Sequence, residues 1–113
     1  MRDIEGLLIS WLQKAVGVAA CGDVPEDRPD EFLTVERTGG SRSYGIDTAT
    51  VAVQCWSTSR AAACELAHRV DAALPSLIGE GGVFGVERDS LYNFPDEEGG
   101  TARYQIVATV TTV

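Results

Sequence analysis

The sequence has few basic residues, one histidine and no long apolar run. Nine lysines and arginines stand against seventeen acids, which gives the 113 residues a formal net charge of -8. An acidic surface opposes attraction to phosphate backbones and anionic lipid, so sequence-specific nucleic-acid binding is not expected. No apolar stretch approaches the roughly 18 residues of a membrane span, and Asp3 and Glu5 stand where a signal peptide needs basic and then apolar residues. These absences predict a soluble intracellular protein that does not enter a membrane.

Cysteine is also scarce. Cys21, Cys55 and Cys64 cannot all pair, and none has the C-x-x-C spacing of a zinc or redox site. We interpret Cys55 and Cys64 as buried small apolar residues and Cys21 as the one cysteine open to exposure. With 44% hydrophobic residues, a chain of this length buries roughly two-thirds of its unfolded surface without staples. The sequence therefore predicts a single domain, 1–113.

Apolar residues recur at helical spacing in two segments. The first predicted helix covers 3–17, with Asp3 near its start and Gly17 at its end. The second covers about 59–74, with Thr58 and Ser59 as candidate N-caps and Pro75 disturbing its end. On the first helix we expect Trp11 to anchor the apolar stripe to the sheet.

Four segments are rich in β-branched and aromatic residues, which predicts strands at 32–37, 48–57, 83–89 and 103–112. In the second strand Val51, Val53 and Cys55 share one face, and Trp56 lies on the other. If the first face meets the helices, the Trp56 ring is left for a neighbouring subunit or a loop to cover.

The remaining segments are predicted loops. Prolines and acids exclude a helix or a central strand over 22–30, while glycine and serine suggest a long, mobile hairpin loop over 39–47. A third, polar loop is expected from about 90 to 102. We expect the loops at 39–47 and 90–102 to become ordered through contacts with partners.

The order helix, strand, strand, helix, strand, strand predicts an α+β fold. Two amphipathic helices need one shared apolar surface, and one face of a mostly antiparallel four-stranded sheet supplies it.

No enzymatic constellation is evident. His68 has no second histidine for a metal site and is predicted to be a surface or boundary residue. The acidic clusters at 23–31 and 96–98 lie in polar loops without calcium-loop spacing, and the glycines at 79–85 match no phosphate-binding motif. We therefore expect no catalytic residue, no cofactor and no metal.

Several segments together resemble one family. The run from Val24 to Gly40, in which a proline-flanked loop enters a strand ending in Arg-Thr-Gly-Gly, is similar to tail terminator proteins of phages and prophages with long, non-contractile tails. The stretch Val53–Ser57 before an alanine-rich helix also resembles that family, as does a loop with Pro95-Asp96 before a closing strand. The resemblance spans nearly the whole chain.

The resemblance implies a structural protein of virion assembly. Such a subunit forms a homohexameric ring that caps the tail tube, stops tube polymerisation and presents a surface for head joining. Its implied partners are its own copies, the tail tube protein and the head-tail connector protein. It would assemble in the bacterial host cytoplasm and end at the head-proximal end of the virion tail. Open alternatives are another head-tail completion or minor tail protein and, with less support, a small ligand-binding domain or enzyme.

Five residues are candidates for subunit or partner contacts. Arginine and aromatic side chains are enriched at protein interfaces, and these residues lie in or beside the predicted loops and strand face. They are Arg37, Arg42, Tyr44, Trp56 and Arg60.

Overall fold

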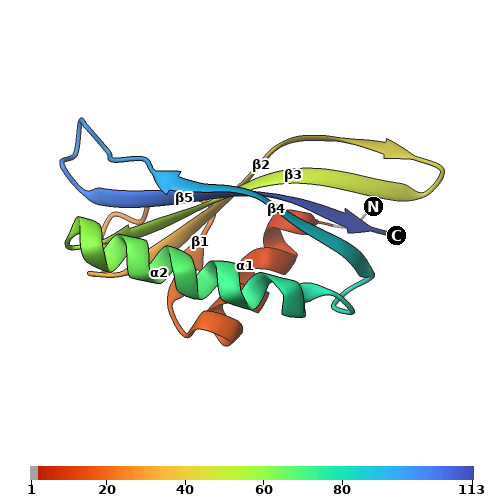
Figure 1. The fold of residues 1–113 in the computed structure, drawn as a ribbon, viewed down its shortest axis with the longest axis horizontal. Helices are drawn as coiled ribbons and strands as arrows, with labels where there is room; N and C mark the ends of the chain where they lie inside the picture. The colour runs from red at the N-terminus through yellow and green to blue at the C-terminus, as the bar shows by residue number, and fades with distance from the viewer. Residues whose placement is uncertain (1–2) are drawn as a thin grey trace.

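Two helices cover one face of a five-stranded sheet in the computed structural model, which describes residues 3–113 (Figure 1). The elements are α1 (Ile4–Val16), β1 (Ala19–Cys21), β2 (Phe32–Ser43), β3 (Ile46–Ser57), α2 (Arg60–Ala73), a short 3-10 helix (Leu74–Leu77), β4 (Val83–Asn93) and β5 (Ala102–Thr112). The strand order is β1-β2-β3-β5-β4, with β1 and β2 parallel and the other pairs antiparallel. The α+β class and the placement of both helices on one face are confirmed.

The helix ends follow the predicted signals. The Asp3 carboxylate accepts a hydrogen bond from the backbone N–H of Gly6, and Gly17 ends α1 with a φ of 76°. Ser59 caps α2 by accepting from the N–H of Ala62, and the 3-10 turn with Pro75 follows it. Neither helix among residues 3–113 is long and apolar enough to cross a membrane.

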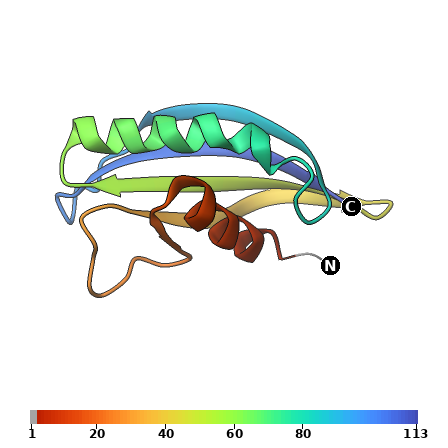
Figure 2. The same cartoon turned by 90° about the horizontal axis from the view of Figure 1, so that it is seen from below.

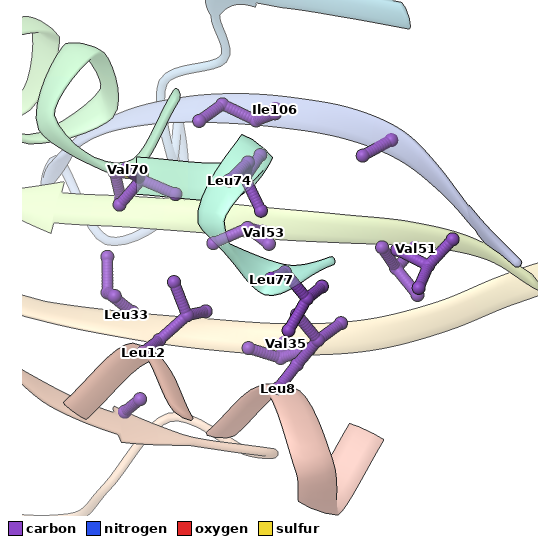
Figure 3. Close-up of a cluster of buried hydrophobic side chains, with 14 of the residues drawn as sticks. Leu8, Leu12, Leu33, Val35, Val51, Val53, Val70, Leu74, Leu77 and Ile106 are labelled. Carbon is purple, nitrogen blue, oxygen red and sulfur yellow. The ribbon is translucent and has the colours of Figure 1, made fainter. Parts of the chain in front are cut away.

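The core lies between the helices and the sheet (Figure 3). Leu8 and Leu12 of α1 point toward Leu33 and Val35 of β2, and the side chains of α2 and the 3-10 turn meet β3 and β5. Val51, Val53 and Cys55 are fully buried on this face, so of the two faces that the alternation left open it is the one that meets the helices.

The expectation that Trp11 anchors α1 is wrong. Ile4, Leu8 and Leu12 are the buried residues of that helix, whereas Trp11 is half-buried at the margin of the core. The apolar stripe of α1 is wider than the surface that the helix packs against the sheet. Trp11, at the edge of the stripe, is therefore left partly in solvent.

The strands are longer and more numerous than predicted. Residues 39–47 are not a long loop, because β2 and β3 pair up to Ser43 and Ile46 around a two-residue turn. Strand β4 likewise continues to Asn93, which shortens the predicted loop at 90–102 to residues 94–101. The fifth strand, β1, was missed because three residues of Ala-Ala-Cys have no strand pattern of their own and become extended only by pairing with Phe32–Thr34.

Candidate functional site

The β2–β3 hairpin continues beyond the helices at one end of the molecule, and we call residues 37–49 the arm. Figures 1 and 2 show its tip reaching past α1, α2 and the C-terminus along the longest dimension, which measures 43 Å. From Ser41 to Ile46 every residue is exposed. Strand β5 pairs with β3 up to Asp47, so only the outer part of the arm is two-stranded. A two-stranded ribbon without helices behind it has little core of its own, so local contacts must hold its shape.

The segment Arg37-Thr38-Gly39-Gly40 forms the base of the arm. The register of β2 against β3 shifts between Arg37 and Gly39, which makes Thr38 a β-bulge. Gly40 has a φ of 124°, and a Cβ atom there would collide with the carbonyl oxygen of Thr48 and lie 2.9 Å from the Cα of Ala49. Only glycine fits this position.

An ion pair fastens the two strands of the arm. Arg37 donates from both terminal nitrogens to Asp47, at 2.7 and 2.8 Å, and Arg42 lies 3.5 Å from the same carboxylate. The hydrogen bonds from Arg37 hold the pKa of Asp47 below its usual value, against the opposing effect of burial. The backbone N–H of Arg37 also donates to Glu5 of α1 at 2.6 Å, which ties the base of the arm to the core.

The tip of the arm consists of Tyr44 and Gly45, with φ values of 52° and 77°. Two positive φ values are the mark of a type I′ turn, in which Asn-Gly is the favoured pair. Tyr44 is the only residue other than glycine with positive φ in the described chain, and its side chain is 100% exposed.

The sheet face opposite the helices carries a continuous chain of hydrogen bonds across four strands. Trp56 Nε1 donates to Thr34 Oγ1 at 3.0 Å, and Thr34 donates to Gln54 at 3.0 Å. Gln54 donates to Gln105 at 2.9 Å, and Gln105 donates to the hydroxyl of Tyr92. These polar groups satisfy one another's hydrogen-bonding capacity. The row of hydrogen bonds therefore fixes the strand register on a face that no helix covers.

Trp56 lies on that open face as predicted, but it is only 3% exposed. Its ring stacks on Phe32, with centroids 5.4 Å apart, and the guanidinium groups of Arg103 and Arg28 lie 4.8 and 5.5 Å from its centre. The sequence left open whether a neighbouring subunit or a loop covers the Trp56 ring. Side chains of the same chain cover it. Trp56 is therefore a core residue of the open face and not an exposed interface residue.

Loop 94–101 and the start of α2 lie at the end of the molecule opposite the arm (Figure 2). A shallow depression lies between them. We call it the end groove; it holds about 460 Å³. Its lining comprises Thr58, Ser59, Arg60, Asn93, Pro95, Asp96, Glu97 and Gly100–Ala102. A second depression of about 330 Å³, lined in part by Arg28 and Asp30, adjoins it through Thr58 and Gly100–Ala102.

The five predicted contact residues separate into two groups. Arg37, Arg42 and Tyr44 lie together on the arm, although Arg37 is committed to Asp47 within the chain. Trp56 and Arg60 lie near the other end, Trp56 covered and Arg60 exposed on the lining of the end groove.

Several residues of these sites were not identified from the sequence. Asp47 was assigned to a loop, and only its pairing opposite Arg42 shows that it holds two arginines. Glu97 was treated as one member of a solvated acidic run and lies in the end groove. Alternation in β3 and β5 is enough to place Gln54 and Gln105 on one face, but the Tyr92 partner requires the extension of β4.

Among residues 3–113, these contacts bring no catalytic constellation together. Within residues 3–113 no group of three or more His, Cys, Asp or Glu side chains is placed to hold a metal ion, and His68 is exposed on α2 as predicted. Cys55 is buried, Cys21 and Cys64 are half-buried, and all three thiols are free.

The chain matches no protein-family model and no curated protein.

Proposed function

We propose that the chain is a structural subunit of phage tail assembly, which forms a ring with its own copies and caps the tail tube as a tail terminator does. The arm is the observation that carries this proposal. Its outer part is a two-stranded projection with an exposed aromatic tip, held by the ion pair between Arg37 and Asp47. The chain itself gives that tip nothing to contact. Such a projection suits contact with another protein surface.

The residues that resemble tail terminators also build the arm. Arg-Thr-Gly-Gly forms its base, with the bulge at Thr38, the backbone of Gly40 and the Arg37 ion pair. The resembling stretch Val53–Ser57 lies on the neighbouring strand and supplies Trp56 and Gln54 of the open face. Arg-Thr-Gly-Gly therefore presents the arm, whereas Val53–Ser57 lies toward the opposite end of β3. The resemblance supports the proposal through the base of the arm.

A ring has to match the symmetry of the tube that it caps, so we propose a cyclic homo-oligomer of six subunits. The net charge of -8 suits a passage for DNA, because an acidic lumen does not bind phosphate groups. The tail tube protein and the head-tail connector protein are the proposed neighbours on the two sides of the ring.

The sites found here give less support to an enzyme or a ligand-binding domain. The depressions at the loop end are open to solvent, and the carboxylate with a lowered pKa, Asp47, is already paired with Arg37. Its environment stabilises the arm, and it lies away from both depressions.

Electron microscopy of tail tubes tests the proposal directly. The purified protein is mixed with polymerising tube protein from the same phage, and we expect a ring at one end of each tube and an end to further growth there. The tube protein alone is the control and should continue to elongate. Tubes that grow equally long with bare ends in the presence of the chain would exclude the terminator role.

A further inference from the structure

The two ends of the molecule differ in charge and shape, and they complement each other. We propose that the tip of the arm of one copy seats in the end groove of the next copy, which makes the subunit contact of the ring. This inference rests on the proposed ring and specifies which surfaces form it.

Tyr44 points to a binding role for the tip. A bulky residue rarely adopts positive φ, and the turn would be formed more easily by asparagine. The tyrosine ring makes no packing contact within the chain that would offset the strain, because it is 100% exposed. A strained residue with an unburied aromatic ring is best explained by a contact made outside the subunit.

Charge favours a second copy as the occupant. Residues 37–49 contain two arginines and one aspartate, so the arm is basic in a chain whose net charge is -8. The loops at the opposite end are acidic, with the following carboxylates: Asp23, Glu26, Asp27, Asp30, Glu31, Asp96, Glu97 and Glu98. Arg28 pairs with Asp96 and Arg69 pairs with Glu31, and the remaining carboxylates form no salt bridge with the described residues. Opposite charges on the two ends steer head-to-tail encounters and oppose contacts between like ends.

The end groove offers matching chemistry for the tip. Glu97 is exposed in its lining, and it forms no salt bridge with the residues that the structure describes, so its carboxylate is free to accept a guanidinium group such as that of Arg42. Pro95 gives the lining an apolar surface, and Arg60 supplies a cation for the face of the Tyr44 ring. The depression of about 460 Å³ has room for a turn that ends in one aromatic side chain.

The positions of the two surfaces produce a directional assembly. The arm and the end groove lie at opposite ends of the 43 Å axis, so each copy that donates an arm leaves its own groove free for another copy (Figures 1 and 2). A contact between different surfaces of identical subunits is heterologous, and it closes into a ring when the rotation between neighbours divides a full turn.

Photo-crosslinking of the full chain tests the contact. A photoreactive phenylalanine analogue replaces Tyr44, the protein is irradiated at increasing concentration up to the millimolar range, and the joined peptides are identified by mass spectrometry. We expect links from the arm tip to residues 93–102 of a second copy. The same analogue in place of Phe84, an exposed aromatic residue on β4, is the control and should not link to that segment.

Substitutions test the chemistry. Tyr44→Asn keeps a favourable turn and removes the ring, and Arg42→Glu and Glu97→Lys reverse the proposed charge partners. We expect each to raise the concentration needed for association by about tenfold or more, and the Arg42→Glu/Glu97→Lys pair to recover much of the loss. Lys14→Glu on α1 makes the same charge change as Arg42→Glu away from both ends and should leave association unchanged. Circular dichroism melts verify that all variants fold.

The outcomes separate this inference from the proposed function. Oligomers whose crosslinks map away from residues 93–102, or that tolerate Tyr44→Asn and Glu97→Lys, overturn the arm-to-groove contact and leave the terminator proposal standing. A chain that remains monomeric at millimolar concentration, with no crosslinked dimer, overturns the contact as well. The capping of tail tubes is decided independently by the tube-growth experiment.

Discussion

The two tryptophans occupy different environments. Trp56 is 3% exposed between Phe32 and two guanidinium groups, and its indole nitrogen begins the hydrogen-bond chain across the open face. Trp11 lies on α1 at the margin of the core, whereas Leu8 and Leu12 of the same helix make the buried contacts. The structure therefore assigns the larger contribution to stability to Trp56, although the helical stripe predicts Trp11 as the anchor.

Alanine substitutions test this ranking. We expect Trp56→Ala to cost about 3–5 kcal/mol of unfolding free energy, because it removes a buried ring and leaves Thr34 without its donor. Trp11→Ala should cost less than about 2 kcal/mol, because much of that ring remains in solvent. Urea denaturation of both variants provides the measurement. Trp56→Phe, which keeps the stacking but loses the indole donor, should fall between wild type and Trp56→Ala; a larger loss in Trp11→Ala would contradict the structure.

Asp47 makes stability depend on acid. Its pKa is lowered in the folded state by the hydrogen bonds from Arg37, so its contribution is complete above the ordinary aspartate pKa of about 3.9 and is lost as pH falls through the lower folded value. We expect Asp47→Asn to lose about 1.5–3 kcal/mol at neutral pH and to differ progressively less from wild type below pH 4. Thermal melts from pH 7 to pH 2 measure this.

The exposed carboxylate of Asp27 supplies the matched control for that series. Asp27→Asn should follow the wild-type stability curve at every pH. A constant difference between Asp47→Asn and wild type down to pH 2 would show that the ion pair with Arg37 does not stabilise the fold through the charge of Asp47.

At the scale of elements, the arm depends on backbone geometry more than on side-chain burial. Its first strand reads Thr-Gly-Gly-Ser, a composition that disfavours a strand on propensity alone. It pairs because β3 continues unbroken, held on its other side by β5 from Asp47 to Ser57. A glycine-rich strand thus takes its conformation from its neighbour, which is why the composition of 39–47 was misinterpreted as a mobile loop.

Two adjacent glycines test this account. Gly40→Ala introduces a methyl group against Thr48 and Ala49 at a φ of 124°, and we expect a loss of about 1–3 kcal/mol centred on the arm. Hydrogen exchange should show faster amides over residues 41–48 and unchanged amides in α1 and α2. Gly39→Ala is the matched control, because its added Cβ meets nothing within 4 Å. Equal effects of the two substitutions would exclude the proposed steric constraint.

At the scale of the whole molecule, the buried thiol reports on global opening. Burial raises the pKa of Cys55 to about 12, and its side chain is fully covered in the core. We expect a thiol-alkylating reagent at pH 8 to modify Cys55 only at the rate of global unfolding, since the reactive thiolate is both scarce and inaccessible. Mass spectrometry of timed samples gives the rates. Cys64, half-buried on α2, is the internal comparison and should react sooner; equal rates would mean that the sheet opens locally around β3.

The sequence by itself determined the elements whose patterns are local. Period-3.6 and period-2 spacing fixed α1, α2, the middle of β3 and β5, and which residues of β3 share a face, because these patterns follow from one segment's own geometry. Tertiary structure alone decided the features that need a distant partner: β1 on β2, the Asp47 ion pair, the cover over Trp56 and the extension of β2 into the arm. Each of these depends on pairing or charge contacts between segments whose own sequences favour no single conformation, so only the assembled sheet selects one.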